Sequence, residues 1–112
     1  MGCGACKPQY WAPDAVTVAT TTELDNVRSA RGVSMQVVFS TAAPTAASIV
    51  LEGSNDGVTW TALISMDQTD TASAVESCGI EDNVLPCRLL RVRIHTVTIG
   101  SCTGIRAHVV AV

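Results

Sequence analysis

The feature that most constrains the fold is a recurrent alternation of apolar and polar residues with a period of two. The alternation recurs in six runs, at residues 16–18, 33–39, 47–52, 58–64, 90–94 and 105–111. Successive side chains of a strand point to opposite faces of a sheet, so each run predicts a strand with one buried face. A further short strand is expected around Val75. No segment keeps the helical period, and the sequence therefore predicts an all-β chain.

Turn-forming residues separate these runs. The clearest turn is residues 53–57, GSNDG, because Gly, Asn and Asp tolerate positive φ. Residues 43–45, which contain Pro44, and residues 100–104 mark two further corners. Seven to eight short strands at this spacing predict an antiparallel β-sandwich over residues 15–112. Residues 1–14 hold two prolines and two glycines without alternation, which predicts an extended N-terminal arm.

Composition limits the classes of partner. The 112 residues suffice for one domain, and only 15% of them are charged, so Ser, Thr and Ala are expected to cover much of the surface. Such a surface packs against another protein with little desolvation of charge. The net charge of −3 disfavours binding to nucleic acid. No membrane span and no secretory signal are expected, because no long apolar stretch occurs.

Two segments carry a resemblance to known proteins. Residues 51–63, LEGSNDGVTWTAL, and residues 89–94, LLRVRI, resemble a strand–turn–strand motif and a later strand of discoidin-like sandwiches. The same pair is similar to segments of small structural proteins of tailed-phage virions, and the resemblance runs from Ile49 to Ile94. Arg88 and Leu89 stand where discoidin domains usually have an aromatic residue, which disfavours carbohydrate or lipid binding of the discoidin type.

The resemblance implies a structural role in a virion. It is that of a capsid cement, or decoration, protein that stabilises a phage head by binding neighbouring subunits. The implied partners are the major capsid protein or other virion proteins, and a homo-oligomer is expected. The implied location is the virion, after synthesis in the host cytoplasm. An alternative is a carbohydrate-binding or tail/fibre-associated β-sandwich module.

Five residues are candidates for partner binding. Tyr10 and Trp11 make the arm too apolar for a solvated tail, so their rings are expected to dock on this domain or on a neighbouring subunit. Arg91, Arg93 and Arg106 share the outward parity of their strands. If the last two long strands are neighbours, these arginines form a basic stripe that suits an acidic patch on a partner. The other interpretation is a solvated face that deters edge aggregation.

The cysteines offer a weaker hypothesis of a metal site. Cys3 and Cys6 have the spacing of a zinc knuckle, and Cys78 and Cys87 are the remaining candidate ligands. The eight residues between Cys78 and Cys87 do not fit a second knuckle. A Cys78–Cys87 disulfide is an alternative, and reduced thiols acting as small hydrophobes, Cys102 among them, are the favoured interpretation. No metal and no cofactor are therefore expected.

No residue pattern points to an enzyme. His95 and His108 fall on the outward parity of their strands, and no Ser or Cys nucleophile has a recognisable motif around it. Trp60 could stack on a sugar, but it shares parity with Val58 and Ile64. The sequence therefore favours Trp60 as a core residue between the sheets, packed on Phe39, Val37, Ile49 and Val92.

Overall fold

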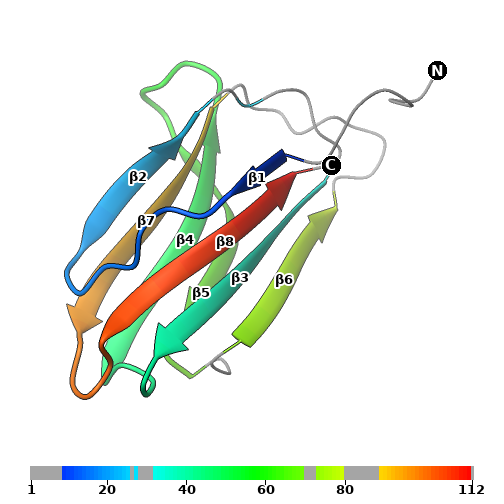
Figure 1. Cartoon of the computed structure of the whole chain (residues 1–112). Helices are drawn as coiled ribbons and strands as arrows, with labels where there is room; N and C mark the ends of the chain where they lie inside the picture. Colours follow the sequence, from blue (N-terminus) through cyan, green and yellow to red (C-terminus); the bar gives the residue numbers. More distant parts are fainter. Residues whose placement is uncertain (1–8, 26, 28–31, 70–72, 80–88, 112) are drawn as a thin grey trace.

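The structure, a computed structural model, describes residues 9–25, 27, 32–69, 73–79 and 89–111. Within these residues, eight strands form two four-stranded sheets that face each other (Figure 1). Sheet A has the order β1-β8-β3-β6, formed by Gln9–Trp11, Gly104–Ala111, Gly32–Ser40 and Ser73–Gly79. Sheet B has the order β2-β7-β4-β5, formed by Thr20–Leu24, Leu89–Thr98, Ala46–Ser54 and Thr61–Asp67.

The strand order defines an eight-stranded jelly roll. Every paired strand runs antiparallel to its neighbour. Only the β4–β5 hairpin stays within one sheet, and every other connection between consecutive strands crosses to the opposite sheet. This crossing pattern is that of jelly-roll sandwiches. The predicted antiparallel β-sandwich is confirmed. Within the described residues there is no helix, and so none that could cross a bilayer.

Most of the core consists of inward-facing residues that the alternation predicts. Along β3, the buried residues are Val33, Met35, Val37 and Phe39. Along the facing sheet they include Ala47, Ile49 and Leu51 of β4 and Leu90, Val92 and Ile94 of β7. Side chains from both sheets therefore pack together in the space between them, and burial of this apolar surface is the main stabilising contribution.

Two strand predictions are displaced along the chain. Val16 makes only an isolated bridge to Ile105, and the strand begins later, at Thr20. The sequence of β2, TTTEL, buries only Leu24, so it lacks the alternation that marks the other strands. β5 begins at Thr61 rather than at residue 58, because the preceding residues belong to the turn. The strand expected around Val75 is confirmed as β6.

The prediction of an extended arm over residues 1–14 is wrong for residues 9–11. Gln9–Trp11 forms β1, which pairs with the last strand in the register Tyr10↔Val110 and Trp11↔Val109. Figure 1 shows β1 lying along β8 at the edge of sheet A. The short segment carries no visible alternation, but its aromatic residues favour a strand wherever an open edge is available. The boundary expected after residue 14 therefore falls within the sandwich. Residues 1–8 lie outside the described residues.

Candidate functional site

Nearly all the described side chains on the outer face of sheet A are uncharged. The described side chains of this face come from β1, β3 and β8, and they are Tyr10, Ser34, Gln36, Val38, Ser40, Arg106, His108 and Val110. The register places these side chains in rows across the sheet: Tyr10, Val110 and Ser34; His108 and Gln36; Arg106 and Val38; and Ser40, opposite Gly104. Arg106 is the only described residue of this face with a permanent charge. The rest of the described face is polar or aliphatic, so a partner protein can pack on it without removing water from an ion.

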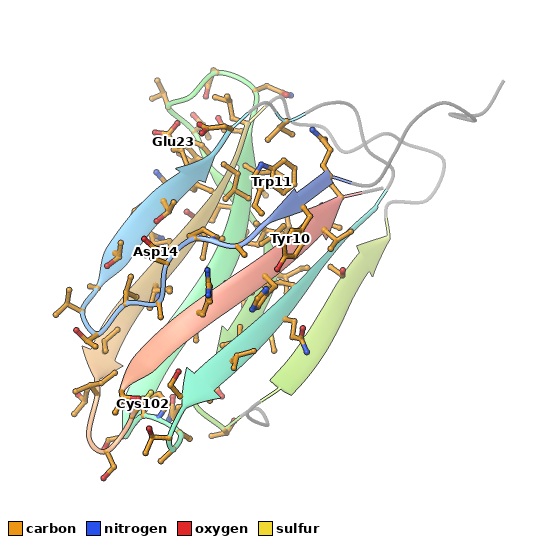
Figure 2. All side chains as sticks on the ribbon, in the orientation of Figure 1. Tyr10, Trp11, Asp14, Glu23 and Cys102 are labelled. Atoms are coloured by element: carbon orange, nitrogen blue, oxygen red, sulfur yellow. The ribbon has the colours of Figure 1, made fainter. Side chains whose placement is uncertain are left out.

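Tyr10 and Trp11 point to opposite sides of β1 (Figure 2). The Tyr10 ring stacks on the His108 ring, with centroids 5.9 Å apart and planes inclined by 25°, and its hydroxyl hydrogen-bonds to Nδ1 of His108. Tyr10 nevertheless remains 59% exposed. Trp11 packs against the core, and its Nε1 donates to the Asp25 carbonyl at 2.8 Å. Both rings therefore contact this domain, but in different ways: Trp11 packs on its core, whereas Tyr10 lies on its surface and stays accessible.

Arg106 fastens the N-terminal segment to sheet A. Between the Trp11–Val109 and Val16–Ile105 pairs, the N-terminal segment is one residue longer than β8. Pro13 lies in this stretch and has no N–H to donate to the sheet. The Arg106 guanidinium donates through Nε to the Pro13 carbonyl at 2.9 Å and through Nη2 to the Ala12 carbonyl at 3.1 Å. Arg106 is therefore occupied within its own chain.

The outer face of sheet B contains a compact ion-pair cluster. Glu52 of β4 lies opposite Arg91 of β7, and Arg93 lies opposite Val50 in the next row. Arg91 donates from Nε to Oε1 of Glu52 at 2.7 Å, and Arg93 donates from Nε and Nη2 to the two carboxylate oxygens at 3.3 and 3.2 Å. The Glu52 side chain is only 8% exposed, while those of Arg91 and Arg93 are 24% and 38% exposed. Two guanidinium groups therefore cover one nearly buried carboxylate.

Trp60 belongs to this cluster and not to the core. The guanidinium carbon of Arg91 lies 4.1 Å from the centre of a Trp60 ring, a cation–π geometry. Trp60 is half-buried and precedes β5, so the prediction that it packs between the sheets is wrong. Parity fails because Val58, 82% exposed, and Trp60 lie in the turn segment, where strand alternation does not apply. Ile64 and Met66 supply the core contacts of β5 instead.

Two opposing effects act on the Glu52 carboxylate. Burial disfavours its charged form, whereas the hydrogen bonds from Arg91 and Arg93, together with their positive charges, favour it. The favourable interactions prevail and lower the pKa of Glu52 below its ordinary value. Glu52 is therefore ionised at neutral pH and orients both arginines.

The β4–β5 turn is held by Asp56. Its Oδ1 accepts from the Val58 and Thr59 backbone N–H groups, both at 2.8 Å, and from the Ser54 hydroxyl at 3.0 Å. The Thr59 and Val58 N–H groups and the Ser54 hydroxyl lower the pKa of Asp56 to about 2. Gly57 has φ +76°, which residues other than glycine rarely adopt. The predicted GSNDG turn is thus confirmed, with Gly53 and Ser54 ending β4.

The predicted basic stripe is absent from this fold. Arg91 and Arg93 lie on the outer face of sheet B, whereas Arg106 lies on the outer face of sheet A. The last two strands, β7 and β8, follow each other in sequence but belong to opposite sheets. The outward parity of all three arginines is confirmed, because buried residues alternate with them. Parity within a strand is readable from the sequence; the sheet to which the strand belongs is not.

A shallow hollow lies beside the ion-pair cluster on sheet B. It is lined by Ser48, Val50, Ser65, Met66, Asp67, Thr69 and His95. Asp67 Oδ1 accepts from the Thr69 N–H at 2.8 Å, and Nδ1 of His95 hydrogen-bonds to the Thr96 hydroxyl at 2.9 Å. The part of the chain that the structure describes holds no group of three or more side chains suited to bind a metal ion.

The cysteine hypotheses concern positions that the structure mostly does not describe. Cys3, Cys6 and Cys87 lie outside the described residues, and the backbone of Cys78 lies opposite Val33 in the β3–β6 ladder. The zinc and disulfide alternatives therefore stay predictions. Cys102 is a buried free thiol whose Sγ donates to the Gly104 carbonyl at 3.2 Å.

The sequence patterns considered above do not predict two features of the site. Glu52 is the centre of the sheet B cluster, and the Tyr10–His108 contact joins positions near opposite ends of the chain. Outward parity of Glu52 was a usable signal, since a carboxylate that alternates with core residues suits a pair of outward arginines. The pairing of β4 with β7 was needed to connect them.

Comparison with known proteins agrees with the fold. No protein-family model matches the chain, and no curated protein matches it by sequence. The crystal structure of SPBc2 prophage-derived protein YomS is similar to this structure, with a TM-score of 0.53 over 95% of this chain and 96% of that chain. The two sequences are 17% identical over this match, so the likeness concerns the jelly-roll architecture alone.

Proposed function

We propose that this chain is a non-enzymatic structural protein of a phage virion, most specifically a capsid cement protein that binds neighbouring subunits of a phage head. The observation that carries the proposal is the outer face of sheet A. That face offers one exposed aromatic ring, Tyr10, among short polar and aliphatic side chains, and its only described permanent charge is bound within the chain. Such a face packs on another protein with little desolvation cost.

Two further observations support the proposal. Jelly-roll sandwiches are common in viral capsids. The structural similarity to a prophage-derived protein extends over nearly the whole of both chains. The expected partners are the major capsid protein or other virion proteins, and the expected location is the virion.

The test uses particles that lack the protein. Purified full-length chain is mixed with them, and bound protein is measured after gradient sedimentation. The wild-type chain is expected to cosediment with heads and raise their resistance to heat. Tyr10→Ser is expected to bind at least about tenfold more weakly, because a central aromatic side chain typically dominates such contacts.

A matched control distinguishes the loss of the Tyr10 contact from the loss of any exposed apolar side chain. Val18 is 66% exposed but belongs to the segment between β1 and β2 and to none of the rows on the outer face of sheet A, so Val18→Ser is expected to bind like wild type. Circular dichroism and a thermal melt confirm that each variant is folded. Equal binding by Tyr10→Ser and wild type, or no association of wild type with heads, contradicts the proposal.

A carbohydrate-binding or tail/fibre-associated module is the second candidate. The exposed ring of Tyr10 favours it, because a sugar can stack on an aromatic face that remains open to solvent. Trp60, the other candidate ring, already stacks against Arg91. Cosedimentation with isolated tails instead of heads, together with loss of glycan binding in Tyr10→Ser, would favour this candidate.

A further inference from the structure

The outer face of sheet B carries opposite charges on adjacent strands. Glu23 of β2 lies opposite Arg91 of β7, and Arg93 lies one row further along. Neighbouring strands in a sheet are about 4.8 Å apart. Arg91 does not bind Glu23; it turns instead toward Glu52 on its other side and toward Trp60. Among the described residues, the exposed Glu23 carboxylate therefore has no ion-pair partner.

The two arginines keep unused hydrogen-bond donors. Arg91 reaches Glu52 through Nε alone, so no described protein group accepts from its two terminal amino groups. Arg93 uses Nε and Nη2, which leaves Nη1 without a described acceptor. Glu52 and the Trp60 ring fix the Arg91 guanidinium, so little side-chain entropy is lost when it binds a further carboxylate. One Glu52 charge against two arginines leaves the cluster with an excess positive charge.

We propose that this face is a contact between two copies of the chain. In this contact, Glu23 of each copy binds the Arg91–Arg93 pair of the other. A two-fold axis running between β2 and β7, parallel to the strands, places β2 of one copy over β7 of the other. The same residues then meet twice, as an isologous interface requires. The observation behind the choice of a second copy is charge complementarity: the face supplies both the acidic group and the basic pair.

The remaining side chains of this face permit close approach. Thr21 flanks Arg93 on one side, and Val50 of β4 flanks it on the other. Asp67, on β5 at the far edge of the sheet, lies outside the region where β2 and β7 of the two copies overlap. The contact deepens the proposed function by naming a second copy as one of the neighbouring subunits, but it needs no particle.

The test is the oligomeric state of the purified full-length chain in free solution, measured by sedimentation velocity over a concentration series. The wild-type chain is expected to dimerise at low ionic strength. Its dimer dissociation constant is expected to rise at about 1 M salt, where the Debye length falls to about 3 Å. Glu23→Arg is expected to raise the dimer dissociation constant at least about tenfold, because two attractive contacts become repulsive in each dimer. Glu23→Gln is expected to give a smaller change in the same direction.

Asp25→Arg is the matched control. It makes the same change in charge two residues further on, just beyond the end of β2, and is expected to weaken dimerisation clearly less than Glu23→Arg, because Asp25 lies farther along the strand from the Arg91–Arg93 pair. A wild-type chain that stays monomeric at all concentrations at low salt overturns the proposal. Equal weakening by Glu23→Arg and Asp25→Arg also overturns it, because the effect would then follow from net charge alone. Either result leaves the particle-binding test of Tyr10 unaffected, so the two proposals fail separately.

Discussion

The outer faces of the two sheets are organised in opposite ways. On sheet B, the charged side chains bind one another, with Glu52 held between Arg91 and Arg93 and the Trp60 ring under Arg91. On the outer face of sheet A, the one described side chain with a permanent charge, Arg106, binds the N-terminal segment, and the Tyr10 ring stays open to solvent. The comparison teaches that outward parity alone does not make a residue available to a partner: the outward arginines first satisfy groups of their own chain.

Among the polar contacts on the two outer faces, removal of Glu52 is expected to have the largest effect, since it leaves two like charges side by side without their acceptor. Glu52→Ala is expected to lower the free energy of unfolding by about 3 kcal/mol, the lower end for breaking a buried pair because both arginines are partly exposed. The measurement is urea denaturation at neutral pH. Ser34→Ala, on the outer face of sheet A, is expected to change stability by less than about 0.5 kcal/mol. Similar values for the two variants would remove the contrast between the faces.

Loss of the Arg106 contacts should destabilise sheet A locally. Arg106→Ala removes two charge-assisted hydrogen bonds to carbonyl groups, and is expected to cost about 2 kcal/mol. Hydrogen exchange of the β1 amides is expected to accelerate more than that of the β4 amides, because Arg106 holds only the edge segment. Arg106→Lys keeps the charge but cannot span both carbonyls. Its free energy of unfolding is expected to lie between those of Arg106→Ala and wild type. Uniform acceleration over both sheets would contradict this assignment.

Truncation of Trp60 is expected to destabilise the fold less than truncation of an aromatic residue in the core. Trp60→Ala removes a cation–π contact and a half-buried ring, and is expected to cost about 1 kcal/mol. Phe39→Ala, inside the sandwich, is expected to cost about 3–5 kcal/mol. Thermal unfolding of both variants checks the comparison. A Trp60→Ala cost equal to that of Phe39→Ala would mean that Trp60 contributes to the core after all.

Acid is expected to destabilise the β4–β5 turn, with a smaller effect on stability than the substitutions above. The folded-state pKa of Asp56 is about 2, lower than its ordinary value of 3.8, so its stabilising contribution is present above the ordinary value. That contribution is lost as the pH falls from about 4 toward about 2. Asp56→Asn is expected to have a flatter pH dependence of its denaturation midpoint over this range. Parallel curves for the variant and wild type would show that the turn hydrogen bonds do not depend on the carboxylate charge.

Much of the fold follows from local pattern. The alternation at residues 33–39 and 105–111 correctly predicts β3 and β8 with their buried faces, and the GSNDG residues predict the hairpin turn. β1 and β2 escape such an analysis for a physical reason. Both are short edge strands, and their places depend on an open edge elsewhere in the molecule rather than on their own periodicity.

The candidate site depends on long-range pairing, which local pattern does not supply. Arg91 and Arg106 have the same outward parity, and only the assignment of β7 and β8 to opposite sheets separates them. Glu52 meets Arg91 because β4 pairs with β7 across a separation of 39 residues. Trp60 departs from its predicted place because alternation stops where the turn begins.

The most direct test of the proposed structural role is hydroxyl-radical footprinting of the chain on purified heads, compared with the chain in free solution. If sheet A is the face that contacts the shell, Tyr10, His108 and Val110 are expected to lose reactivity on particles. Val18 and Val58, which are exposed outside that face, are expected to react equally in both states. Unchanged reactivity of Tyr10 on particles that carry the chain would contradict the account.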